Sequence, residues 1–194
     1  MSSEAIAEES YTGFPTPRMG MLIFLISESM MFVTLISGYL VLRASLTAWS
    51  PVGQPHLNVT LTGINTLFLL SSSATFHFAE VFFRKSQKGK FLGWLGLTIL
   101  LGTTFLTIQA FEYSRLMAET LSLSSSTYGS VFFALTGFHG LHVFVGIFLL
   151  SLIFWRTASN NLSKANHHLV DNIGLYWHFV DGVWVVLFSV LYLW

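Results

Sequence analysis

The sequence predicts an all-α, polytopic membrane protein with five transmembrane helices. Of its 194 residues, 53% are hydrophobic and 9% are charged, whereas a soluble domain carries about a quarter charged residues. The hydrophobic residues form five long runs, and the charged residues gather between these runs. No run shows the polar face that a helix of a soluble bundle needs, so we predict that each run spans a bilayer.

The first three predicted spans each meet basic residues at an end. Residues 19–42 lie between two arginines, residues 60–83 stop before an Arg-Lys pair, and residues 91–111 follow a lysine. At 1.5 Å per residue, each run is long enough to cross a hydrocarbon core of about 30 Å. Basic side chains at such ends are typical of the lipid headgroup region.

The last two predicted spans are also long enough to cross the hydrocarbon core. Residues 131–155 end at Arg156, and residues 172–194 follow a polar loop. Two linking segments contain turn-forming residues: prolines and a glycine in 43–59, and a serine-rich stretch in 112–130. We predict that both are turns on the external side.

The distribution of basic residues predicts the orientation. One side of the predicted topology holds seven of them: Arg18, Arg84, Lys85, Lys88, Lys90, Arg156 and Lys164. The other side holds Arg43 and Arg115. By the positive-inside rule, the N-terminus is cytoplasmic and the C-terminus lies outside. Residues 1–18 are acidic and have no separate apolar core, so we expect a flexible cytoplasmic tail rather than a signal peptide. Residues 19–194 then form a single transmembrane domain.

Composition also excludes several classes of site. The chain has no cysteine, which excludes a disulfide framework, a cysteine nucleophile and cysteine-ligated metals. Its formal net charge is zero, and it lacks the basic stripe that nucleic-acid-binding proteins present. We predict no nucleic-acid partner and no metal bound by this chain.

Glu28 is the clearest candidate functional residue. An ionisable group at bilayer depth is costly and is therefore a candidate by default. Glu28 lies about ten residues into the first span, at a depth of about 14 Å. A carboxyl group there is either protonated or held by partners on a neighbouring helix. It can be a structural hydrogen-bonding residue or a slowly titrating functional acid.

Two pairs of polar residues share helix faces. His178 and Asp181 are three residues apart in the fifth span, and we predict a structural intramembrane pair. His139 and His142 have the same spacing in the fourth span and lie among glycines, which favours a role in helix packing. A haem held by two histidines on facing helices, drawn from His77, His142 and His178, is the alternative.

The remaining polar candidates lie near the membrane surfaces. His167 and His168 are adjacent in the last cytoplasmic loop. They are either two ordinary polar loop residues, the favoured interpretation, or a pair that collects and passes protons at the surface. Arg156 follows two aromatic residues, an arrangement that suits contact with a lipid phosphate. Gln109 and Glu112 lie at the external end of the third span, where we expect structural roles within reach of water.

Seven segments together resemble subunit III of haem–copper oxidases. The most specific are Thr-Gly-Phe-His-Gly-Leu-His-Val at 136–143 and Tyr-Trp-His-Phe-Val-Asp-Gly-Val-Trp at 176–184. The others stand in the family's order at 18–28, 64–72, 109–113, 128–133 and 166–168. The longest members of that family have seven spans, and this chain resembles a form that lacks the first two.

The resemblance implies an accessory subunit of a proton-pumping terminal oxidase that reduces O2 to water. In that family the haem and copper belong to partner subunits, and subunit III has no catalytic centre. It packs directly beside subunit I, in a complex with subunit II and small subunits, and it stabilises subunit I.

Further implications concern lipid and particular residues. The family's helices hold phospholipid in a cleft, and the bound lipid supports proton uptake and oxygen access. In this chain the cleft is expected between the first two spans and the last three. Glu28 matches the family's carbodiimide-sensitive glutamate, which is expected near subunit I. Arg156 matches a position that contacts lipid in the family. The expected location is an energy-transducing membrane, the bacterial cytoplasmic membrane.

Several functions remain open at this stage. The loop at 166–168 and the region of Trp184 favour an oxidase that uses cytochrome c. Subunit III of a quinol oxidase, or the related partner of a nitric oxide reductase, is the close alternative. A small proton-coupled transporter using Glu28, His178 and Asp181, or a membrane haem protein, belongs to different functional classes.

Overall fold

The computed structural model describes residues 16–45, 58–118, 126–160 and 167–193. These residues form five long helices and no strand: α1 (Thr16–Ser45), α2 (Val59–Arg84), α3 (Lys88–Ala118), α4 (Thr127–Ala158) and α5 (His167–Phe188). After α5 the polypeptide continues directly as a short π-helix, η2 (Ser189–Leu193). Each of the five helices is long and apolar enough to cross a membrane. The predicted fold class is therefore confirmed.

The helices extend beyond the predicted spans. α3 continues to Ala118, and α4 begins at Thr127, so much of the predicted turn at 112–130 is helical. Hydrophobic runs mark only the stretch that crosses the hydrocarbon, whereas a helix can continue into the headgroup region. Residues 16–18 of the predicted tail already belong to α1. The rest of that tail and most of the predicted turn at 43–59 lie outside the described residues.

Polar side chains set the beginnings of two helices. The side chain of Asn58 accepts a hydrogen bond from the backbone N–H of Leu61 (3.0 Å) at the start of α2. Ser126 does the same for Gly129 (3.0 Å) at the start of α4. Such caps satisfy N–H groups that have no partner inside the helix.

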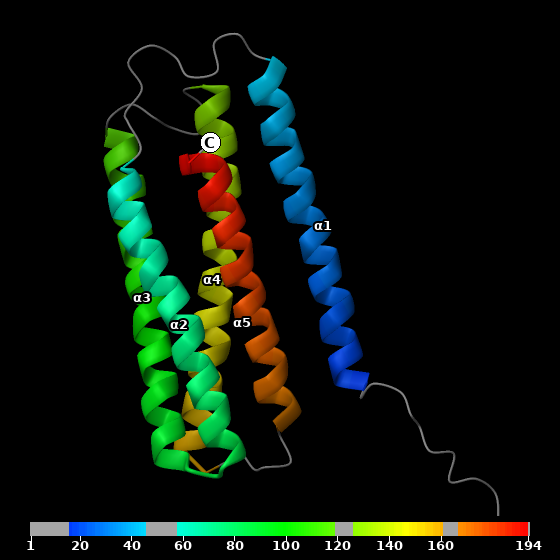
Figure 1. Cartoon of the computed structure of the whole chain (residues 1–194), viewed down its shortest axis with the longest axis vertical. Coiled ribbons are helices and arrows are strands. Elements are labelled where there is room, and N and C mark those ends of the chain that lie inside the picture. The colour runs from blue at the N-terminus through cyan, green and yellow to red at the C-terminus, as the bar shows by residue number, and fades with distance from the viewer. Residues whose placement is uncertain (1–15, 46–57, 119–125, 161–166, 194) are drawn as a thin grey trace, which may run out of the picture.

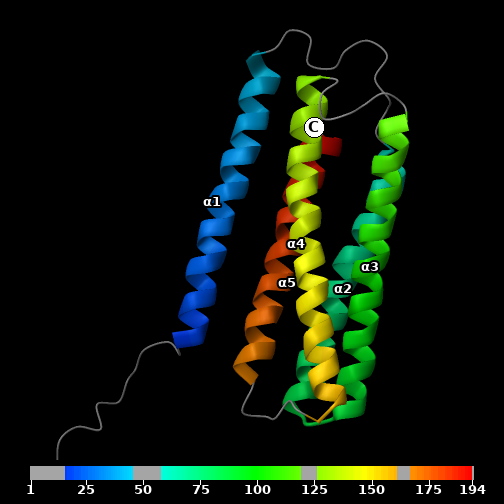
Figure 2. The ribbon, with the colours of Figure 1, turned by 180° about the vertical axis from the view of Figure 1, so that it is seen from behind.

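Four helices form a bundle, and α1 lies beside it. Figure 1 shows α2 and α5 on the near face of the bundle, and Figure 2 shows α4 and α3 on the opposite face. The main neighbours of α1 are α5 and α4, whereas α2 packs along α3 and α5. The predicted grouping of the first two spans against the last three remains a prediction. The lipid-filled cleft and the orientation in the membrane remain predictions.

Trp177 fixes the centre of the bundle. The side chain is fully buried and lies against glycines of two other helices. A Cβ atom built on Gly102 would lie 2.8 Å from its ring, and one on Gly146 would lie 2.7 Å away. The indole N–H donates a hydrogen bond to Ser72 on α2 (3.1 Å). Trp177 thereby joins α5 to α2, α3 and α4.

Candidate functional site

A hydrogen bond between Glu28 and His142 links α1 to α4. The Oε2 atom of Glu28 lies 3.1 Å from Nε2 of His142. The two side chains are 21% and 13% exposed, respectively. The ring of Phe32, also on α1, meets the imidazole edge-on at a centroid distance of 5.1 Å. The structure thus brings together two residues that the sequence analysis treated separately.

The hydrogen bond made by the other ring nitrogen of His142 determines which side chain donates in the contact with Glu28. Nδ1 lies 2.7 Å from the carbonyl oxygen of Phe138, and because a carbonyl can only accept, Nδ1 carries a hydrogen. In a neutral ring Nε2 then has only a lone pair, so a protonated Glu28 must donate. In a charged ring Nε2 donates to the Glu28 carboxylate. Either way, one proton is shared between the two side chains.

Ser73 of α2 connects His178 and Asp181 of α5. Its hydroxyl lies 2.7 Å from Nδ1 of His178 and also forms a short hydrogen bond with Oδ2 of Asp181. Asp181 is 3% exposed, whereas His178 lies at the surface of the bundle. The other Asp181 oxygen, Oδ1, has no hydrogen-bond partner in the part of the chain that the structure describes. The expected pair on one helix is therefore part of a contact between two helices.

His139 lies in the core, unlike His142. It is 1% exposed; its ring stacks on Trp184 at 4.8 Å and meets Phe105 edge-on at 6.0 Å. Neither ring nitrogen has a hydrogen-bond partner among the described residues. Trp184 in turn donates its indole N–H to Thr66 on α2 (2.9 Å). His139 therefore packs between aromatic rings of α3 and α5.

Charged and polar side chains meet where α5 begins. The rings of His167 and His168 lie 3.8 Å apart. Arg84 of α2 and Asp171 of α5 form an ion pair at 3.1 Å, and together with His167 they line a pocket of 210 Å³. Arg156 lies exposed in the last turn of α4.

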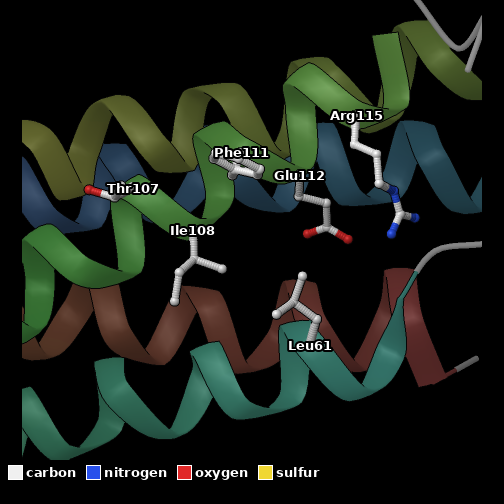
Figure 3. A pocket seen from close by; sticks show the side chains of 6 residues that line it. All are labelled: Leu61, Thr107, Ile108, Phe111, Glu112 and Arg115. Carbon is white, nitrogen blue, oxygen red and sulfur yellow. The ribbon is translucent and has the colours of Figure 1, made fainter. Parts of the chain in front are cut away.

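Glu112 is buried, contrary to the expectation that it reaches water. It is 3% exposed, and the hydroxyl of Thr62 on α2 lies 3.3 and 3.2 Å from its two carboxylate oxygens. Because α2 packs closely along α3 here, a position near the membrane surface does not leave the side chain exposed. Beside it is a mainly apolar groove of 260 Å³ (Figure 3), lined by Leu61, Thr107, Ile108, Phe111, Glu112 and Arg115.

Metal ligands require several suitable side chains in one place. Within the described ranges, no group of three or more His, Asp or Glu residues is arranged to hold a metal ion. Glu28 with His142, and Ser73 with His178 and Asp181, instead form hydrogen bonds between helices. Such bonds position helices and can hold or pass protons.

Almost the whole chain is similar in sequence to proteins of one known family. A family model described as cytochrome c oxidase subunit III matches residues 5–194. Cytochrome c oxidase subunit 3 of Synechocystis sp. is 39% identical, over 93% of this chain and 77% of the relative. The protein of the same name from Thermostichus vulcanus is 39% identical over 90% and 86%. Cytochrome bo(3) ubiquinol oxidase subunit 3 of Pseudomonas putida is 34% identical over 90% and 84%.

Proposed function

The chain belongs to the cytochrome c oxidase subunit III family and is an accessory subunit of a haem–copper oxidase, and we propose that it supports the subunits that reduce O2. It is an integral membrane protein with five helices able to span the bilayer. In this proposal the haem and copper belong to partner subunits, and this chain has no catalytic centre. It packs directly on subunit I of the proton-pumping enzyme, alongside subunit II.

We infer that the electron donor is cytochrome c. The relatives named cytochrome c oxidase subunit 3 in Synechocystis and Thermostichus reach 39% identity, whereas the ubiquinol oxidase relative of Pseudomonas putida reaches 34%. This difference favours cytochrome c, and a quinol oxidase is the second candidate. A copper-bearing subunit II in the purified complex would support the first and its absence the second.

The contact between Glu28 and His142 carries our proposal for how the subunit acts. It joins α1 to α4 at membrane depth through one hydrogen bond of 3.1 Å. A helix held in this way keeps its position beside subunit I and beside bound phospholipid. The subunit would thereby support proton uptake, oxygen access and the durability of subunit I during turnover.

Replacing Glu28 tests this role. In the assembled oxidase, Glu28→Ala should leave haem content and initial electron transfer largely intact, while the active lifetime becomes several-fold shorter. Glu28→Gln is the matched control, since an amide N–H can still donate to a neutral His142 ring. If Gln preserves the lifetime, the contact acts by holding α1. An immediate loss of all turnover in a fully assembled complex would contradict the proposal.

Two further proposals concern the surface residues. Arg156 binds the phosphate of a phospholipid, and the pair His167 and His168 collects protons at the cytoplasmic surface of a bacterial membrane. The exposed position of Arg156 and the short distance between the two imidazole rings support these roles. Arg156→Ala should lower the amount of phospholipid that co-purifies, as mass spectrometry would measure.

The most direct test is purification of the tagged chain from native membranes in a mild detergent. A reduced-minus-oxidised spectrum and mass spectrometry then identify what accompanies it. Co-purification of a large haem-bearing subunit I is the expected result. A chain that purifies alone and colourless would contradict the role in an oxidase and favour a proton-coupled transporter.

A further inference from the structure

Two histidines lie exposed at membrane depth on the face formed by α2 and α5. The His77 side chain is 68% exposed, and His178 is also exposed. At 1.5 Å per residue, His77 lies about 10 Å from the Arg84 end of α2, and His178 about 16 Å from the His167 end of α5. Histidine lacks the long stem that allows Lys and Arg to reach the membrane surface from such depths.

The hydrogen-bonding capacity of both rings is only partly used. Nδ1 of His178 meets Ser73, but Nε2 has no partner within the described residues. For His77, the nearest charged group is Glu80, whose carboxylate oxygen is 4.0 Å from Nδ1. A polar group left without a partner in hydrocarbon is costly. This face therefore needs polar neighbours from outside the chain.

The exposed surface near the histidines includes small residues as well as bulky apolar ones such as Leu70 and Phe78. Ser71 and Ala74 of α2 and Gly182 of α5 are exposed, and a Cβ atom built on Gly182 would meet nothing within 4 Å. Small residues allow another helix backbone to approach closely, and polar side chains beside them fix its register. α2 and α5 lie next to each other on the near face in Figure 1.

On the opposite side of the bundle, α4 differs because its exposed residues between 138 and 155 are all apolar and include no histidine. α4 is the helix nearest the viewer in Figure 2, and it exposes bulky apolar side chains along its length. The exposed ones are Phe138, Leu141, Phe144, Val145, Phe148, Leu152 and Trp155. Such a face suits lipid, and it provides a control within the same molecule.

We propose that a transmembrane helix of another subunit of the oxidase packs on the α2–α5 face. This face is defined by Ser71, Ala74, His77, His178 and Gly182. The partner helix brings carboxylate, hydroxyl or carbonyl oxygens to the two histidines, and its backbone lies over the small residues. The inference rests on the proposed function, because it needs a chain that is assembled with other membrane subunits.

Photo-crosslinking in the assembled oxidase tests the proposal. A small aliphatic amino acid bearing a diazirine replaces either Ala74 or, as the control, Leu152. After illumination of native membranes, we expect position 74 to join a transmembrane helix of another oxidase subunit and position 152 to join lipid. Products from position 74 that contain only lipid, a second copy of this chain or this chain itself would overturn the proposal.

A second measurement uses His77, which has no hydrogen bond in the described part of the chain. Because an interhelical hydrogen bond contributes about 0.6 kcal/mol on average, His77→Leu should lower retention of the chain after detergent washing about threefold, relative to haem. His77→Gln, which keeps hydrogen-bonding groups, should restore it, and Phe148→Leu should have no effect. Equal retention of both His77 variants would overturn the proposal.

Failure of the two proposals can be told apart. If the unsubstituted chain does not co-purify with a haem-bearing subunit, the proposed function is wrong. If it does co-purify, but position 74 reaches only lipid, the function stands and the α2–α5 face is not the docking surface.

Discussion

α1 and α5 can both span a membrane, yet they are held in place in opposite ways. In its most apolar stretch, 6% of α1 is buried inside the molecule, against 44% of α5. α5 carries the buried Trp177 and Trp184 into the centre of the bundle, whereas α1 reaches α4 through Glu28 and His142. In a bilayer, apolar surface alone does not drive two helices together. Close side-chain packing therefore fixes the position of α5 in the bundle, and a hydrogen bond helps to fix the position of α1 beside it.

The largest expected effect comes from one methyl group added beside Trp177. In Gly146→Ala the new Cβ would lie 2.7 Å from the buried indole, so we expect destabilisation by about 1–3 kcal/mol. Gly38→Ala is the matched control on α1, where nothing lies within 4 Å. It should be neutral or stabilising by about 0.5–1 kcal/mol. Equilibrium unfolding in mixed micelles measures both, and equal losses would remove the distinction between the two helices.

A smaller effect is expected where α5 hydrogen-bonds to α2. Thr66→Val removes the acceptor of the Trp184 indole N–H and should cost about 1 kcal/mol. Thr103→Val is the control, because the Thr103 hydroxyl is exposed and bonds only within its own helix. The same unfolding measurement applies. A loss of equal size in Thr103→Val would show that the contact between helices contributes nothing specific.

The smallest expected effect is the coupling between Glu28 and His142. A double-mutant cycle of Glu28→Leu and His142→Leu should give a coupling energy of about 0.6 kcal/mol, and at most about 1.7 kcal/mol. Stability measured in the four proteins gives this value. Additive effects of the two substitutions would mean that the 3.1 Å contact does not hold α1 in place.

Local features of the sequence predicted the spans and the residues that share a helix face. The hydrophobic runs indicated five helices, and the spacing of His178 and Asp181 placed them together. Ser73, which connects them, is one of three consecutive serines, and only the packing of α2 on α5 selects it. The partner of Glu28 depends likewise on how α1 meets α4, and the burial of Glu112 on how α2 covers α3. Spacing along one helix carries no information about these contacts.

The central claim is that the contact between Glu28 and His142 holds α1 to the bundle. Because the chain has no cysteine, spin labels can be placed freely for distance measurement by pulsed electron paramagnetic resonance in lipid nanodiscs. One pair joins Val33 of α1 to Leu97 of α3, and a control pair joins Leu70 of α2 to Leu152 of α4.

On going to Glu28→Ala, the distance distribution from α1 to α3 should broaden, while that from α2 to α4 stays narrow. An unchanged distribution from α1 to α3 would contradict the account.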